Sequence, residues 1–85
     1  MEPHQAIKFP LSTEKSIRLM ESQNQLLFSV DMAATKEDIK SAVEKLFKVK
    51  VTDVRTEISK GNKRAYVRLS EENPAIDVAT NLGLM

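Results

Sequence analysis

The stretch Ala34-Thr35-Lys36-Glu37-Asp38-Ile39-Lys40-Ser41-Ala42-Val43-Glu44-Lys45-Leu46-Phe47, which leads into Val49-Lys50-Val51, decides the fold. Its apolar residues recur at the three- and four-residue spacing of one helical face, namely Ile39, Ala42, Val43, Leu46 and Phe47. Thr35 precedes this face, and Asp38 lies three positions after Thr35, which is the spacing of a reciprocal N-terminal cap. The stretch therefore predicts an amphipathic helix that covers a sheet and runs into a strand.

Four other segments alternate apolar and polar residues as half-buried strands do: 7–9, 26–30, 51–58 and 63–69. Pro10 ends the first strand or marks a sheet edge. Val51 has the opposite parity to Val54, so the third strand either starts near Thr52 or contains a β-bulge. Residues 59–62 supply a tight hairpin turn, in which Gly61 and Asn62 are both able to adopt a positive φ.

Two further helices flank these strands. Ser12 or Thr13 caps a helix that runs to about Ser22, and the last helix is capped by Asn73, opened by Pro74 and closed by Gly83. The order is β-α-β-α-β-β-α. We therefore predict an α+β fold, with a small antiparallel sheet of about four strands and helices packed on it, as one domain spanning residues 1–85.

The composition excludes several classes of protein. The chain has no cysteine and one histidine, His4, in an N-terminal segment that we expect to be loose. It shows no signal-peptide pattern and no apolar run near the roughly 20 residues that span a bilayer, so we expect a soluble intracellular protein without membrane insertion. Glycine-rich phosphate loops, metal-ligand spacings and nucleophile–base pairs are all absent from the sequence. We expect no catalytic residue, no bound metal and no other cofactor.

The net charge of +1 conceals an uneven distribution. Residues 51–70 contain five basic and two acidic side chains, whereas residues 71–85 contain three acidic and no basic ones. If the central helix covers the sheet face of Phe28, Val54 and Val67, the residues of opposite parity lie on the other face. That set comprises Lys8, Leu27, Arg55, Arg64, Tyr66 and Arg68.

A basic sheet face with one aromatic residue is typical of a surface that contacts phosphates. Two questions remain open at this point, namely the role of the charged side chains and the packing of Tyr66. Charged residues also keep exposed strands soluble and prevent edge pairing. Tyr66 either packs on the first predicted helix, against Ile17 or Met20, or stacks on a base.

Three motifs resemble those of the large-subunit ribosomal protein twenty-three family, a universal family at the polypeptide exit. Pro10-Leu11-Ser12-Thr13-Glu14-Lys15 resembles its P-x-x-T/S-E-K signature, and residues 34–51 resemble its central block. Gly61-Asn62-Lys63-Arg64-Ala65-Tyr66-Val67 resembles its final-strand motif. Together, in the family's order, these motifs cover most of the chain.

The resemblance implies a structural role on large-subunit ribosomal RNA near the tunnel exit, without enzymatic activity. It also implies a neighbouring ribosomal protein, number twenty-nine, and transient contact with the signal recognition particle or the translocon. The glutamate of the T/S-E-K motif belongs to the docking region of the family, which assigns partner docking to Glu14. Only residues 59–62 separate the last two strands, as in the archaeal form, whereas many bacterial members insert a long basic tunnel loop there.

With the resemblance, the basic residues become candidates for RNA contacts, mainly to phosphates. The first candidates are Lys15, Lys36, Lys40, Arg55, Lys63, Arg64 and Arg68, followed by Lys8, Lys50, Lys60 and Tyr66. The alternative function is a free-standing α/β interaction or ligand-sensing module that acts through its sheet edge. The near-zero net charge and small size motivate that alternative.

Overall fold

The computed structural model of the chain describes residues 2–11 and 13–81. Its elements are α1 (Pro3–Ala6), β1 (Ile7–Pro10), α2 (Glu14–Gln23), β2 (Gln25–Val30), α3 (Lys36–Phe47), β3 (Val51–Ser59), β4 (Asn62–Leu69) and α4 (Ala75–Asn81). The predicted α+β class and the predicted order of strands and helices are confirmed. One further turn of helix, α1, precedes β1. Gly83, the predicted end of the last helix, lies outside the described residues.

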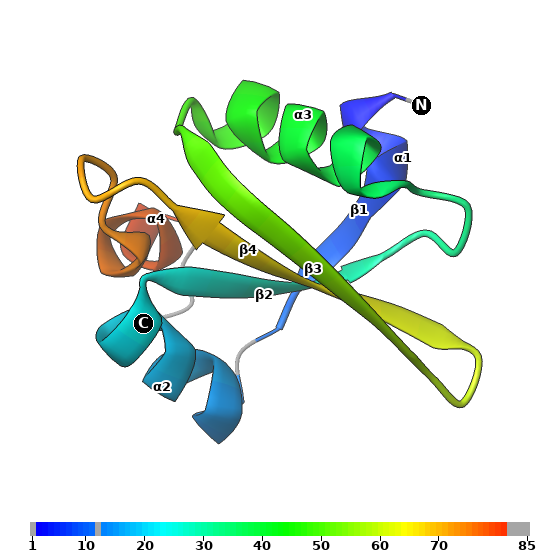
Figure 1. The fold of residues 1–85 in the computed structure, drawn as a ribbon, viewed down its shortest axis with the longest axis horizontal. Coiled ribbons are helices and arrows are strands. Elements are labelled where there is room, and N and C mark those ends of the chain that lie inside the picture. The colour runs from blue at the N-terminus through cyan, green and yellow to red at the C-terminus, as the bar shows by residue number, and fades with distance from the viewer. Residues whose placement is uncertain (1, 12, 82–85) are drawn as a thin grey trace.

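Among the described residues, four strands form one antiparallel sheet in the order β1-β2-β4-β3. Figure 1 shows α3 and α1 on one side of this sheet and α2 and α4 on the other. We call the side under α3 the first face and the side under α2 the second face. The first face carries the buried apolar residues Leu26, Phe28, Val30, Ala65, Val67 and Leu69.

The core of the first face forms where α3 packs on β3 and β1 and, through Phe47, on β2. Ile39, Ala42 and Val43 are at most 1% exposed, and the Phe47 ring stacks on Phe28 with the centroids 5.6 Å apart. Leu46, which the periodicity predicts to share this buried stripe, is 44% exposed. That prediction is wrong because Phe47, and not Leu46, contacts the sheet at the last turn of α3.

The predicted cap of α3 is confirmed. The backbone amide of Asp38 donates to the Thr35 hydroxyl, and the backbone amide of Thr35 donates to the Asp38 carboxylate, each at 3.1 Å. The bond from the Thr35 amide favours the ionised carboxylate, so it lowers the pKa of Asp38 from its ordinary value of 3.8. A lowered value means that the contribution of this cap is present above pH 3.8 and is lost as the pH falls through the lowered pKa.

The β3–β4 hairpin shows which form of β3 is present and which residues of the turn adopt a positive φ. The register shifts between Val51 and Asp53, so β3 contains the bulge. Lys60 (φ 51°) and Gly61 (φ 78°) adopt the positive φ values of the turn. The suggestion that Asn62 adopts one is wrong, because Asn62 already pairs with Ser59 and only two residues are left for the loop.

The N-terminal segment is more ordered than the sequence predicts. Pro3 occupies the start of α1, where its missing N–H costs no hydrogen bond. Ala6 is fully buried, and its carbonyl accepts from the backbone amide of Asp31 at 2.9 Å. Because α1 also packs on α3, residues 3–6 belong to the folded body.

Asn24 joins three elements at the end of the sheet opposite the hairpin turn. It ends α2 in the left-handed conformation (φ 54°, ψ 41°), and its amide nitrogen lies 3.1–3.2 Å from the carbonyl oxygens of Leu69, Ser70 and Asn73. Its side-chain oxygen accepts from the backbone amide of Ala75, the first residue of α4, at 2.6 Å. One side chain thus fixes the end of α2, the end of β4 and the start of α4.

The sequence predicts Asn73 as the cap of α4, and this prediction is wrong. The Asn73 side-chain oxygen instead accepts from the backbone amide of Lys50 at 2.9 Å, while Asn24 caps the helix from a distant part of the chain. A cap supplied across 51 positions leaves no local sequence signal.

The substitution N24D tests this junction. It places an anionic oxygen where an amide donor faces three carbonyl oxygens, so we expect the free energy of unfolding at pH 7 to fall by about 2 kcal/mol in denaturant titrations. The carbonyl oxygens raise the pKa of the introduced carboxyl, so the loss should shrink as the pH falls through that raised value. The matched control is N62D in the exposed hairpin, which should stay within about 0.5 kcal/mol of the parent. Equal stabilities of N24D and N62D would contradict the role of Asn24.

Candidate RNA-binding surface

The strand register arranges the side chains of the second face in rows that cross β2, β4 and β3. The row nearest the hairpin turn contains Ser29, Arg64 and Glu57, and the middle row contains Leu27, Tyr66 and Arg55. The third row contains Gln25, Arg68 and Asp53. Residues in one row have neighbouring Cβ atoms, so each arginine has its own set of neighbours.

The middle row lies under α2. Tyr66 is 6% exposed, and its hydroxyl accepts from the Lys15 ammonium at 3.2 Å and donates to the Glu57 carboxylate at 3.1 Å. The ammonium of Lys15 also lies 5.2 Å from the ring centroid, and the Arg55 guanidinium lies 5.8 Å from it. Each such cation–π contact contributes roughly 0.5–1 kcal/mol at an exposed site. Of the two alternatives for Tyr66, the structure shows packing under α2, where Lys15 contacts both its hydroxyl and its ring.

Arg68 lies in the third row, in different electrostatic surroundings. Its Nε donates to the Gln23 carbonyl at a long 3.4 Å, and it pairs across the sheet with Asp53. It lines a groove of about 830 Å³ between α2, the end of β4 and the segment before α4, together with three carboxylates. These carboxylates belong to Glu21, Glu71 and Glu72. A phosphate would meet more negative than positive charge there, so Arg68 is the weakest candidate among the arginines.

Arg64 is the most available cation of the second face. It is exposed on β4, and its guanidinium makes no hydrogen bond or ion pair with any residue that the structure describes. Glu57 lies opposite it on β3, but the Glu57 carboxylate is bonded to the Tyr66 hydroxyl. An exposed arginine without a partner keeps all its donors for a bidentate contact with phosphate.

Several lysines lie near Arg64 at the hairpin end of the molecule, where a hydrogen bond joins the hairpin to the loop before α3. The Lys63 ammonium donates to the Ala34 carbonyl at 2.6 Å, two residues before Lys36 at the start of α3. Lys60 is exposed in the turn, and Lys8 is exposed on β1 beside the Ile7–Val30 pair. We call Lys8, Lys36, Lys60, Lys63 and Arg64 the hairpin-end cluster. Lys40 lies one turn farther along α3 and is exposed.

Lys50 lies at the opposite end of the sheet. It directly precedes β3, where Val51 pairs with Leu69, and its backbone is bonded to Asn73 and Ser70. The predicted RNA contacts therefore form no single patch. The structure brings together the hairpin-end cluster, holds Lys15 and Arg55 at Tyr66, and separates both groups from Lys50 and Arg68.

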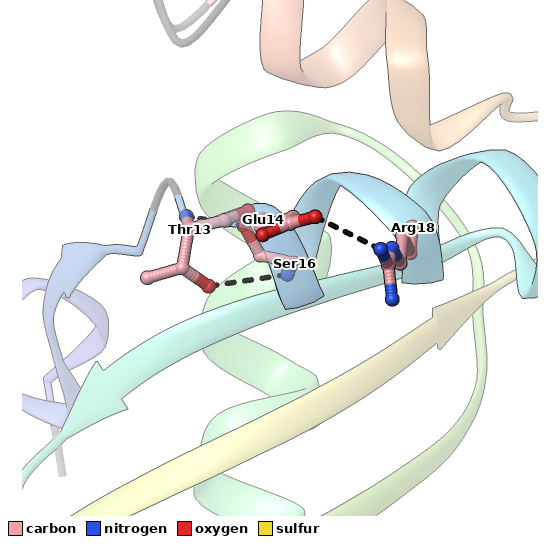
Figure 2. A network of polar contacts seen from close by, with 4 residues as sticks. All are labelled: Thr13, Glu14, Ser16 and Arg18. Atoms are coloured by element: carbon pink, nitrogen blue, oxygen red, sulfur yellow. Dashed lines mark hydrogen bonds and ion pairs between the residues drawn. The ribbon is translucent and has the colours of Figure 1, made fainter.

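Glu14, assigned to partner docking, lies in the first turn of α2. Figure 2 shows its carboxylate paired with the Arg18 guanidinium. The two atoms lie 2.8 Å apart, and the side chains of Glu14 and Arg18 are 81% and 76% exposed, respectively. Thr13 caps the same helix through reciprocal bonds with Ser16: the Ser16 amide donates to the Thr13 hydroxyl at 3.2 Å, and the Thr13 amide donates to the Ser16 hydroxyl at 2.7 Å. An exposed pair of this kind adds at most about 0.5 kcal/mol, so Glu14 is free to exchange Arg18 for a basic group on another molecule.

No helix of the described residues has the length and apolar character needed to cross a membrane. Within residues 2–11 and 13–81, no group of three or more histidine and acidic side chains could hold a metal ion.

Comparisons with known proteins extend these observations. The sequence model of the family described as ribosomal protein L23 matches residues 5–76. Large ribosomal subunit protein uL23 of Methanococcus aeolicus is 46% identical over 85 residues, and that of Methanococcus vannielii is 45% identical over 85 residues; each alignment covers 99% of both chains. The uL23 protein of Caldivirga maquilingensis is 57% identical over 74 residues, which cover 86% of both chains.

The fold and these relatives define the class of the molecule as a small α+β ribosomal protein. In particular, the chain belongs to the ribosomal protein L23 family. The resemblance seen in the three motifs is confirmed, including its archaeal character, since these relatives are archaeal. The prediction that the chain is not an enzyme is confirmed as well, because the family is structural.

The structure predicts different effects on RNA binding for substitutions of Arg64 and Lys63, and salt titrations can measure them. We expect R64A to lower the slope of log affinity against log salt concentration by about one unit, the effect of one lost phosphate contact. K63A should change this slope less and should lower the free energy of unfolding by about 1 kcal/mol, because its ammonium is bonded to Ala34. The readout is binding of the chain to deproteinised large-subunit ribosomal RNA at several salt concentrations. R18A, which removes an exposed arginine outside the cluster, is the control; equal slopes for R64A and R18A would exclude Arg64.

Proposed function

We propose that the chain binds large-subunit ribosomal RNA near the polypeptide tunnel exit, as one RNA-binding domain spanning residues 1–85. Membership of the L23 family makes it a structural constituent of the large ribosomal subunit, and hence of cytoplasmic ribosomes. Within this role, the hairpin-end cluster meets RNA phosphates, while Lys15, Arg55 and Lys40 contribute from the adjoining surface. Lys50, Arg68 and Tyr66 contribute less, because acidic neighbours surround Arg68 and α2 covers Tyr66.

The observation that carries the proposal is the match across residues 5–76 combined with the unpaired guanidinium of Arg64. A ribosomal protein that is nearly neutral overall needs a local excess of cations to compete for phosphates. The hairpin end supplies this excess, whereas the three carboxylates of the groove would repel RNA. The proposed orientation places the hairpin end toward RNA and the groove away from it.

The same role includes docking at the tunnel exit. Glu14 is exposed at the start of α2, on the side of the sheet opposite α3 (Figure 1), and among the described residues it pairs only with Arg18, which is also exposed. We assign this turn to contacts with factors such as the signal recognition particle or the translocon, and we place ribosomal protein twenty-nine as a neighbour on the subunit.

Sedimentation tests the proposed function. A tagged chain expressed in an archaeal host should co-migrate with large subunits in a sucrose gradient and should leave them at high salt, because phosphate contacts weaken with ionic strength. E14A should co-migrate as the parent does, since Glu14 is assigned to factors and not to RNA. A tagged parent chain that remains at the top of the gradient at low salt would refute the proposal.

A further inference from the structure

The bulge in β1 turns Phe9 onto the second face. Ile7 pairs with Val30 and Phe9 with Ser29, so two positions on β1 match one position on β2. The sequence alternation predicts that Ile7 and Phe9 share a face, and this is wrong because of the bulge. Ile7 is buried at 8% exposure, whereas Phe9 is 53% exposed. Bulges at sheet edges commonly redirect a side chain in this way.

The redirected ring extends the row that contains Arg64. Phe9 pairs with Ser29, Ser29 pairs with Arg64, and Arg64 pairs with Glu57, so the row crosses the whole sheet on the second face. Phe9 and Arg64 are two strands apart, or roughly 10 Å at the usual strand spacing. Ser29 between them is half-buried, and α2 covers the neighbouring row of Leu27 and Tyr66 instead.

The residues of this row are those that proteins use to hold an unpaired nucleotide on a sheet. Aromatic rings on open sheet faces stack on splayed bases, while arginine and hydroxyl groups bond to the adjoining phosphate and sugar. Lys8 adds a second exposed cation next to Phe9. The carboxylate at the far end, Glu57, is bonded to the Tyr66 hydroxyl. Lys8 and Arg64 outnumber this one carboxylate, so positive charge is in excess around the exposed ring, which favours an anionic ligand over an apolar protein surface.

We propose that Phe9, Ser29 and Arg64 form a binding site for one unpaired nucleotide of RNA, in which the base stacks on Phe9 and its phosphate bonds to Arg64. This inference rests on the proposed RNA-binding function and adds a base-stacking residue to it. It also means that the chain prefers RNA with a bulged or looped nucleotide over a continuous duplex, because bases inside a helix are already stacked.

Tryptophan fluorescence tests the site directly, because the chain contains no tryptophan. F9W introduces a single emitter in the proposed site, and we expect its emission to be quenched on saturation with deproteinised large-subunit ribosomal RNA. I76W is the matched control, since Ile76 is 40% exposed and lines the acidic groove, which the proposed orientation turns away from RNA. Its emission should change little under the same conditions.

A second variant distinguishes the contribution of base stacking to RNA affinity from that of charge. F9L keeps an apolar side chain and removes the ring, so RNA affinity should fall on the order of tenfold while the salt slope stays unchanged. If R64A lowers the salt slope but F9W is not quenched and F9L binds as the parent does, the nucleotide site is refuted and the proposed function stands. A fluorescence change of F9W with intact large subunits but not with deproteinised RNA would also refute the site, in favour of a protein contact. Absence of RNA binding by the parent chain would refute both.

Discussion

The side chain of Asn24 holds together the end of α2, the end of β4 and the start of α4, and the shape of the second face follows from this junction. Because α2 is anchored at its C-terminal end, it lies along β2 and covers Leu27, Tyr66 and Gln25. Near the N-terminal end of α2, Lys15 contacts the hydroxyl and the ring of Tyr66 and so holds the helix on the sheet there as well. At the hairpin end, α2 leaves the row of Phe9, Ser29 and Arg64 open. A packing constraint at one end of the sheet therefore defines the accessible surface at the other end.

The two ends of the sheet also differ in charge. The near-neutral chain separates its charges between a hairpin end with exposed lysines and an unpaired arginine, and an opposite end whose groove is lined by Glu21, Glu71 and Glu72. In the proposed function, this division orients the sheet on RNA, because phosphates attract the basic end and repel the acidic one. The proposed role needs no chemistry beyond this: in it the chain binds RNA, fixes its orientation and leaves the turn at Glu14 accessible.

The sequence was most informative where a signal is local. The spacing of Thr35 and Asp38, the apolar stripe of α3 and the alternation of β4 each depend on residues a few positions apart, and each is confirmed except for Leu46 in the stripe. What the sequence could not predict depends on distant partners. The cap of α4 comes from Asn24, the Lys63 ammonium is held by Ala34, and the hydroxyl of Tyr66 is held by Lys15.

The open row was missed for a related reason. Alternation assigns Ile7 and Phe9 to one face, and only the pairing of β1 with β2 shows the bulge that separates them. Equal parity likewise made Arg55, Arg64 and Arg68 equivalent candidates, although Tyr66 engages the first and acidic side chains surround the third. A signal for Phe9 was present in the adjacent Pro10, since proline in a short strand marks an edge, and bulges are frequent at edges.

A density map of the large ribosomal subunit with this chain in place tests the orientation most directly. We expect an RNA phosphate within hydrogen-bond distance of the Arg64 guanidinium, a nucleotide base against the Phe9 ring, and no RNA within the groove beside Glu71 and Glu72. A map in which the row of Phe9, Ser29 and Arg64 faces solvent, or in which RNA fills the groove, would contradict it.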